Sequence, residues 1–325
     1  MIQIIIFSFN RAMQLDYLLK SIFTRFKSPG YKIAIIYHAM GDHVSGYEKL
    51  KEKYKSRTDI LFLERTFKRF GLKSYYRTFH DKKNIKRFIK YNLFRFKDID
   101  NFKGLLETLL KSTACEYAMF NTDDGFFFDD VSIAPDILNL IKTNSLSSSY
   151  RLYVGENIDE FPNYIQLVNN TYYSWNYYEN AKFSHWTFPF AVDGTVYHTR
   201  SILRILRKVY YYNPLSLENH TVEYVIKYKL LKRGLGPITS KLVGTLINNV
   251  SLESSNPTIN ISADYLNNKF LEGYRLELVL PNEIKKVNNV PIKVSLTKGN
   301  TEEIVYELEE EGENIHNSYG VGGQQ

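Results

Sequence analysis

The sequence predicts an α/β fold with a Rossmann-like, mostly parallel central sheet flanked by helices. Over the first 65 residues, apolar β-branched runs alternate with segments of helical periodicity. This alternation is typical of parallel strands joined by right-handed crossover helices. Apolar residues make up 44% of the chain, enough for a sizeable core. A length of 325 residues fits one large domain with a smaller appendage.

The opening segment predicts a β-α-β-α-β order. The continuous apolar run Ile2–Phe9 is typical of a buried parallel strand. Apolar residues then recur at helical spacing up to about Phe26, and Ser28-Pro29-Gly30 is expected to end this helix. A strand at 32–37, a helix at 46–54 and a strand at 60–63 are predicted to follow.

The rest of the chain predicts an acidic strand end and later elements. A strand at 116–121 runs directly into Asp123 and Asp124. Further helices are predicted at 102–111, 131–141, 201–209 and 221–231, edge strands at 151–154 and 165–168, and a strand at 195–197. The acidic, then Gly-rich segment 301–325 is expected to be a disordered tail. We therefore divide the chain into two halves of one domain (1–125 and 126–260), a C-terminal extension (261–300) and this tail.

Charge and cysteine content limit the classes of partner and compartment. The formal net charge is +7, with the basic excess concentrated in residues 65–103. Such a segment attracts phosphates of nucleotides, lipid headgroups or nucleic acid, or forms a solvated helix face. A single cysteine, Cys115, excludes an intrachain disulfide. No signal peptide or membrane span is predicted, so we expect a cytoplasmic protein. Peripheral contact with the inner face of the membrane is compatible with this expectation.

Asp123 and Asp124 are the leading candidates for a ligand site. In open parallel sheets, ligands bind beyond the carboxyl ends of the strands. Two adjacent carboxylates there suit a hard divalent cation that also binds phosphates, although Asp-Asp-Gly is equally a good turn sequence. Ser8, Asn10 and Arg11 offer donors at the end of the first strand. Lys103 lies one helix before the acidic strand and is expected to reach a phosphate.

Three segments carry a family resemblance: 7–22 (FSFNRAMQLDYLLKSI), 102–103 with 118–127 (AMFNTDDGFF), and 193–200 (DGTVYHTR) with 213–218 (NPLSLE). They resemble bacterial family-2-like glycosyltransferases of the nucleotide-diphospho-sugar transferase superfamily. The resemblance implies the GT-A fold, a UDP- or GDP-sugar donor, Mn²⁺ or Mg²⁺, and transfer to a glycan or lipid-linked acceptor in surface polysaccharide biosynthesis. It implies Asp124 and Asp123 as metal ligands, with His220 as a distant third ligand and Asp123 also in contact with the nucleotide sugar. By the same resemblance, 1–125 is the nucleotide-sugar-binding half and 126–260 the acceptor-binding half. The chain departs from the family at Asn121-Thr122, where many members carry an aspartate.

Transfer with inversion also needs a carboxylate base for the acceptor hydroxyl. Asp193 is the first candidate, because it ends an apolar run at a glycine turn, and Glu218 is the second. A plain turn aspartate and a plain acid in the first turns of a helix are the alternatives for these two residues.

Two other classes of protein compete with a transferase. A nucleotidyltransferase would need a glycine-rich phosphate loop after the first strand, and the segment 8–11 contains no glycine. A non-catalytic glycan-, RNA- or membrane-binding protein would act through the basic segment 65–103. The acidic pair and Lys103 favour an enzyme, and no nucleic acid partner is expected.

Overall fold

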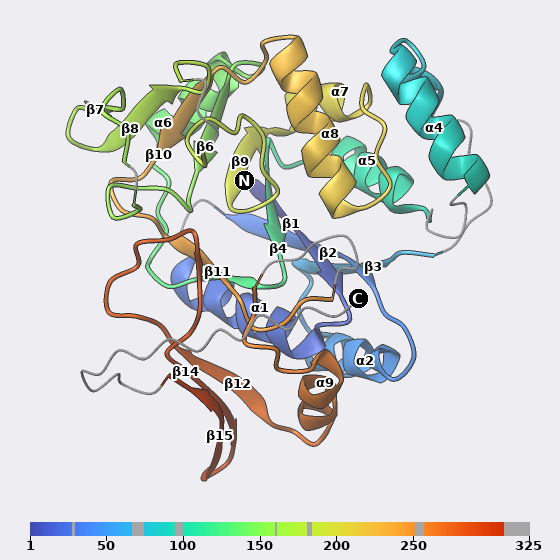
Figure 1. The fold of residues 1–325 in the computed structure, drawn as a ribbon, viewed down its shortest axis with the longest axis vertical. Helices are drawn as coiled ribbons and strands as arrows, with labels where there is room; N and C mark the ends of the chain where they lie inside the picture. The colour runs from blue at the N-terminus through green and yellow to red at the C-terminus, as the bar shows by residue number, and fades with distance from the viewer. Residues whose placement is uncertain are drawn as a thin grey trace, which may run out of the picture.

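A nine-stranded sheet lies at the centre of the protein (Figure 1). The computed structural model describes residues 1–27, 30–66, 75–94, 100–159, 161–180, 184–250 and 257–308. In spatial order the strands are β3 (Ile60–Glu64), β2 (Tyr31–His38), β1 (Ile2–Phe9), β4 (Tyr117–Thr122), β9 (Thr195–His198), β6 (Ser148–Arg151), β10 (Arg233–Gly236), β8 (Tyr172–Asn176) and β7 (Gln166–Val168).

The pairing makes this sheet mostly parallel, as the sequence predicts. β3, β2, β1 and β4 pair in parallel, and β9 then runs antiparallel to both β4 and β6. β10 is parallel to β6, whereas β8 is antiparallel to β10 and to β7. Only β9 and β8 therefore run against the other seven strands. The α/β fold class is confirmed.

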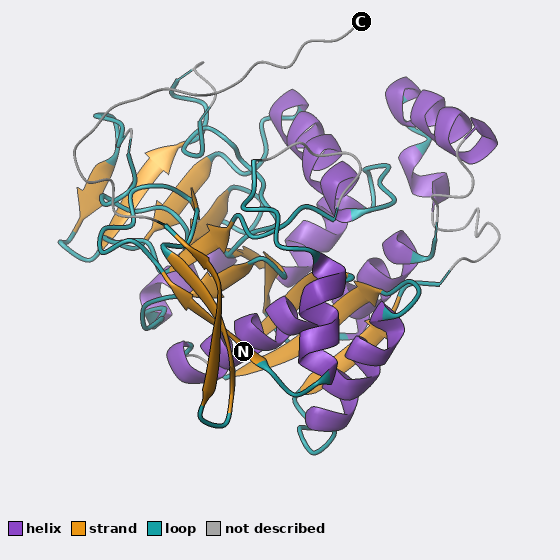
Figure 2. Ribbon diagram, turned by 60° about the horizontal axis from the view of Figure 1, so that its bottom comes forward, coloured by secondary structure: helices purple, strands orange, loops and turns teal. Residues whose placement is uncertain are grey.

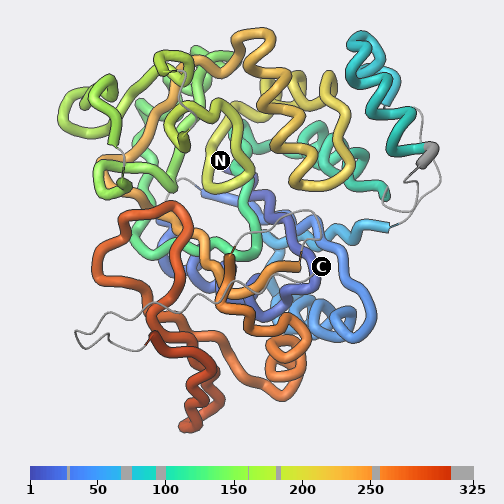
Figure 3. The backbone as a smooth tube through the Cα atoms, viewed as in Figure 1, coloured from blue at the N-terminus to red at the C-terminus, as the bar shows by residue number. Residues whose placement is uncertain are grey.

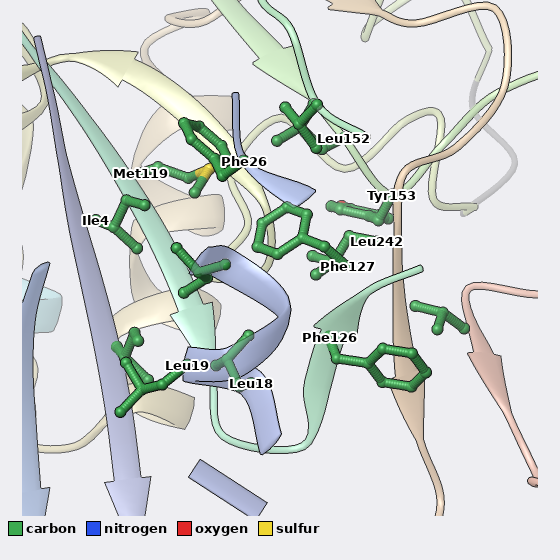
Figure 4. Close-up of a cluster of buried hydrophobic side chains, with 14 of the residues drawn as sticks. Ile4, Leu18, Leu19, Phe26, Met119, Phe126, Phe127, Leu152, Tyr153 and Leu242 are labelled. Carbon is green, nitrogen blue, oxygen red and sulfur yellow. The ribbon is translucent and has the colours of Figure 1, made fainter. Parts of the chain in front are cut away.

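Helices cover both faces of the sheet, as Figure 2 shows. The helices of the first face are α1 (Ala12–Arg25), α2 (His43–Lys53), α6 (Pro135–Thr143) and α9 (Ala263–Leu271), and those of the second are α5 (Phe102–Ser112), α7 (Thr199–Leu206) and α8 (Pro214–Lys227). Side chains alternate along β1 because strand residues point to opposite faces. Ile4 and Ile6 pack with α1, and Ile5 and Phe7 pack with α5 and α7. Figure 4 shows part of the first core, a cluster that includes Leu18 and Leu19 of α1 together with Phe126 and Phe127.

Two small sheets and an outlying helix complete the fold, and Figure 3 traces the path of the chain through them. The first sheet joins β5 (Gly125–Phe127), β11 (Leu242–Thr245) and β13 (Asn288–Asn289), and the second joins β12 (Arg275–Val279), β14 (Lys293–Lys298) and β15 (Thr301–Glu307). α4 (Lys82–Phe94), preceded by the short η1 (Tyr76–Thr78), lies beside α8, with which it forms ion pairs through Glu223. In the part of the chain that is described, no helix is long and apolar enough to cross a membrane.

The structure corrects several predicted elements. The tail prediction is wrong for Thr301–Glu307, which forms β15, because backbone pairing with β14 and the Lys269–Glu303 ion pair offset its acidic composition. The prediction for 309–325 lies outside the described residues. The helix predicted from Val131 begins at Pro135, because Val131 forms a β-bridge with Phe26. The helix predicted from Thr221 begins at Pro214, where Asn213 caps its first turn.

The predicted edge positions are also partly wrong. The strand expected at 151–154 is β6, which ends at Arg151 and lies inside the sheet between β9 and β10. β7 is a true edge strand.

Candidate functional site

The carboxyl ends of β1 and β4 bring the first group of predicted residues together. These strands are parallel neighbours, with Phe7 opposite Thr122. The Asp123 amide donates to the Phe7 carbonyl at 3.2 Å, which extends the pairing one residue past β4. Asp123 therefore lies beside Ser8 and Arg11, as the parallel arrangement predicts.

The Asp123 carboxylate is buried and surrounded by donors. Its Oδ2 accepts from the Ser8 hydroxyl at 2.8 Å and from the Phe9 amide at 3.0 Å. Its Oδ1 accepts from Arg11 Nη1 at 3.0 Å. Burial raises the pKa of Asp123, while the Arg11 charge and these hydrogen bonds oppose the shift. Because all three groups donate, they favour the ionised carboxylate.

Arg11 is the cation of this group, and it is held on every side. Nη1 also donates to Asp124 Oδ2 at 3.1 Å. Nε donates to the Asn248 side-chain oxygen at 2.8 Å, and Nη2 donates to the Asn248 carbonyl. The Arg11 side chain is 8% exposed and that of Asp124 is 36% exposed. The guanidinium thus occupies the space between the two aspartates.

Tyr47 links the backbone of Arg11 to the same group. The Arg11 amide donates to the Tyr47 hydroxyl at 3.2 Å, and this hydroxyl lies 2.5 Å from the Ser8 hydroxyl. Because Ser8 donates its own proton to Asp123, Tyr47 donates to Ser8. The buried Ser8 hydroxyl therefore links the Tyr47 hydroxyl to the Asp123 carboxylate. Asn10 lies at the same strand end, with a positive φ of 53°, and its Oδ1 accepts from the Met40 amide.

A second pair of carboxylates lies next to the first. Asp193 precedes β9, and its Oδ1 accepts from the Thr122 hydroxyl at 2.5 Å. The Gly194 amide donates to the Asn121 side chain at 3.2 Å, which fixes the turn after Asp193. Glu218 lies on α8, and its Oε1 accepts from the Val192 amide at 3.1 Å. Both predicted bases therefore meet at one turn.

The environment raises the pKa of both groups. Burial raises the pKa of Asp193 to about 6, and the Asp124 charge adds to this shift. Burial also raises the pKa of Glu218 to about 8, with the Asp193 charge as the second cause. Both side chains keep partial solvent exposure. Accessible carboxyl groups whose pKa values are shifted toward neutrality are suited to general acid–base chemistry.

Lys103 lies elsewhere, in the core on the second face of the sheet. Its side chain is 1% exposed, and Nζ donates to Glu107 Oε1 at 2.6 Å. Nζ also donates to the carbonyls of Leu206 and Val209, at 3.1 and 3.0 Å, just where α7 ends. Burial lowers the pKa of Lys103 to about 8. These partners give Lys103 the role of a C-terminal cap for α7, in place of the expected phosphate contact.

We expect Lys103→Met to lower the free energy of unfolding by about 2–3 kcal/mol, because methionine leaves two buried carbonyls without a donor. Nucleotide affinity should not change. Urea denaturation and calorimetric titration with UDP would measure both quantities. Lys111→Met is the matched control, since Lys111 is exposed on the same helix. A tenfold loss of UDP affinity with unchanged stability would restore the phosphate role.

The structure does not bring the three predicted metal ligands together. His220 Nδ1 lies 2.7 Å from the Tyr210 carbonyl, and burial lowers the pKa of His220 to about 4. Among the described residues, no three His, Cys, Asp or Glu side chains are grouped to hold a metal ion. A cation between Asp123 and Asp124 would have to displace Arg11. Two unit charges 4 Å apart repel by roughly 4 kcal/mol at an effective dielectric of 20, and a divalent ion doubles this. The space between Asp123 and Asp124, with Arg11 in it, therefore does not fit a divalent cation.

Several residues of this region were missed by sequence reasoning. Thr122 binds Asp193, and its place just before the acidic pair was a usable signal. Asn248 anchors Arg11 from 237 residues away, which no local pattern shows. Arg151 is fully buried in β6, and its Nη1 donates to the His185 carbonyl at 2.6 Å while its charge opposes the raised pKa of Glu218. Its position follows from the pairing of the strands.

A cavity of about 460 Å³ lies apart from these carboxylates. It is lined by residues around Asp129, Asn157 and Lys285, and none of the four carboxylates above lines it.

No family model and no curated protein match this chain. Solved structures give distant likenesses. S. aureus TarS in complex with UDP-GlcNAc is 10% identical, with a TM-score of 0.42, over 79% of this chain and 61% of that chain. The galactosyltransferase LgtC with donor and acceptor sugar analogs is 13% identical, with a TM-score of 0.33, over 70% of this chain and 65% of that chain. Mannosyltransferase PcManGT from Pyrobaculum calidifontis, in complex with GDP-Man and Mn²⁺, is 12% identical, with a TM-score of 0.28, over 48% and 36%.

This chain thus spans less than two thirds of each of these three structures. At TM-scores below 0.5, the likenesses carry no argument about the activity of this chain.

Proposed function

We propose that this chain is a glycosyltransferase that moves a sugar from a UDP- or GDP-sugar to a hydroxyl acceptor. One observation carries the proposal: Asp193 and Glu218, with pKa values raised toward neutrality, lie beside the acidic pair at the carboxyl ends of β1 and β4. The sequence resemblance supports the same reaction class. It also favours a glycan or lipid-linked acceptor, as in surface polysaccharide biosynthesis.

The proposed chemistry is a direct displacement at the anomeric carbon. Ionised Asp193 takes the proton of the acceptor hydroxyl, and the acceptor oxygen bonds to the anomeric carbon. The bond from that carbon to the diphosphate oxygen breaks, and its electron pair leaves with the nucleoside diphosphate. Glu218, protonated at neutral pH, donates a hydrogen bond to a substrate oxygen and leaves Asp193 as the single charged base. Thr122 orients Asp193 through its hydroxyl.

The metal dependence implied by the resemblance is not part of this proposal. Arg11 already lies between Asp123 and Asp124, so its guanidinium occupies the place of a cation shared by the two carboxylates. We therefore route no step through Mn²⁺ or Mg²⁺.

A screen of UDP-, GDP- and CMP-sugars for donor hydrolysis tests the proposal, with and without Mn²⁺. Release of UDP or GDP, abolished in Asp193→Asn, would support the proposed transfer, and release of CMP alone would contradict the choice of donor. Salt-sensitive RNA retention without hydrolysis of any donor would favour the binding-protein alternative instead.

The pH dependence of transfer should be bell-shaped, with an optimum at about pH 7. The base must be ionised, so kcat/KM falls as pH drops below about 6, the pKa of Asp193. The acid must be protonated, so kcat/KM falls as pH rises above about 8, the pKa of Glu218. Because the two groups interact, the profile reports values for the pair. Glu218→Gln should remove the alkaline limb, and a profile that keeps this limb would contradict the role of Glu218.

Peripheral contact with anionic membrane is a further part of the proposal. On α4, Lys82, Lys86 and Lys90 are exposed and Ile89 is 46% exposed, whereas Lys83 and Arg87 pair with Glu223. Each exposed lysine near such a surface contributes about 1 kcal/mol. Replacing these three lysines by glutamate should lower co-sedimentation with vesicles containing phosphatidylserine at least tenfold. Binding that is unaffected by anionic lipid would contradict this contact.

A further inference from the structure

Arg11 lies between two aspartates that differ in exposure. Asp123 is buried, with 6% of its side chain exposed, and Asp124 is 36% exposed. Arg11 Nη1 donates to both of them, at 3.0 and 3.1 Å. One carboxylate therefore faces the interior and the other separates the guanidinium from solvent.

The buried partner is fixed, whereas the exposed one is exchangeable. Asp123 also accepts from Ser8 and from the Phe9 amide, so its carboxylate is anchored independently of Arg11. The backbone of Asp124 is fixed, because its carbonyl accepts from the amide and hydroxyl of Thr245 at 2.8 and 2.7 Å. The Asp124 carboxylate contacts Arg11 at its exposed side. A rotation of the Asp124 side chain would expose the Arg11 guanidinium without moving the backbone.

Arg11 itself cannot follow that movement. Nε and Nη2 are both bound to Asn248, and Asp123 holds Nη1 from the other side. A guanidinium that is fixed in place and presents N–H donors suits an incoming phosphate, whose oxygens bind arginine at least as well as a carboxylate does.

We propose that a phosphate oxygen of the nucleoside diphosphate replaces the Asp124 carboxylate on Arg11, so that the donor binds without a divalent cation. The inference rests on the proposed function. During transfer the anomeric carbon–oxygen bond breaks, and its electron pair leaves with the diphosphate held by Arg11. The acceptor proton goes to Asp193, and Arg11 keeps its charge throughout.

For one substitution, Asp124→Asn, the proposal and a metal site predict opposite changes in nucleotide affinity. If Asp124 competes with phosphate for Arg11, Asp124→Asn should tighten binding of UDP or GDP three- to tenfold in EDTA. If Asp124 holds a metal, wild-type binding should require Mn²⁺, and the same change should abolish nucleotide binding in Mn²⁺. Asp129→Asn is the matched control, because Asp129 pairs with Lys241 away from Arg11.

Isothermal titration with UDP, GDP and pyrophosphate, in EDTA and in excess Mn²⁺, tests the exchange. We expect wild-type affinity to differ less than twofold between the two conditions, and Arg11→Gln to weaken it at least tenfold. Circular dichroism would check that Arg11→Gln is folded, and the Asp124→Asn result stands without it.

The outcomes separate this inference from the proposed function. A tenfold gain of wild-type affinity from Mn²⁺, or loss of binding in Asp124→Asn, overturns the exchange and leaves a metal-dependent transferase. If neither nucleotide binds in any condition but pyrophosphate binds through Arg11, the proposed function fails and the anion site stands. If no probe binds, both fail.

Discussion

Asp193→Asn should lower kcat for glycosyl transfer by roughly 10²- to 10⁴-fold, the usual contribution of a general base. Asparagine keeps the shape and can still accept from the Thr122 hydroxyl, but it cannot take a proton at neutral pH. The KM for the donor should change little, because Asp193 acts on the acceptor. Initial rates with the donor identified by the hydrolysis screen would measure both constants.

Stability distinguishes this effect from damage to the fold. Burial and the Asp124 charge raise the pKa of Asp193, so its ionised form is disfavoured in the folded state. A carboxyl group whose pKa is raised in the folded state lowers the stability of the protein as pH rises from the group's unfolded pKa through its folded pKa of about 6. Removing the charge should therefore leave the Tm unchanged or higher at pH 7. Asp136→Asn serves as a control, because Asp136 is exposed on α6. If the kcat of Asp193→Asn stays within threefold of the wild-type value, Asp193 is not the base.

Asp123→Asn should have the largest effect on stability, a loss of about 3–5 kcal/mol in the free energy of unfolding. Removing one partner of a buried ion pair leaves an uncompensated charge, here Arg11. Asparagine also turns an amide donor either toward Ser8 and the Phe9 amide or toward Arg11, all of which donate to Asp123. Two donors facing each other add an unsatisfied buried group.

Urea denaturation of Asp123→Asn beside Asp124→Asn would measure this difference. Asp124 is partly exposed, so the same change there should cost less than about 1 kcal/mol. Equal losses in the two variants would show that Arg11 depends on both aspartates alike, and would contradict the exchange proposed for Asp124.

The prediction from sequence succeeded where one strand or helix determines its own pattern. The apolar run Ile2–Phe9 forms β1 with the predicted bounds, because a strand covered on both faces needs apolar residues at every position. Prediction failed where a distant segment supplies the partners. Thr301–Glu307 is acidic by composition, yet it pairs with β14 and forms β15.

The candidate site divides in the same way. The parallel order of β1 and β4 is sufficient to predict that Ser8, Arg11 and Asp123 meet at one edge of the sheet. The meeting of Asp193 with Thr122 depends on β9, which inserts antiparallel beside β4. The sequence carries no local signal for that pairing.

By itself, the sequence determined the early strands and helices and the type of side chain at each strand end, because hydrophobic periodicity and turn chemistry are local. Only the tertiary structure decided what those side chains contact. Asn248, far along the chain, fixes Arg11 against Asp123. The carbonyl of Leu206, at the end of α7, accepts a hydrogen bond from the Lys103 ammonium. The charge state and accessibility of a buried group depend on neighbours from other segments, since desolvation and ion pairing act through space.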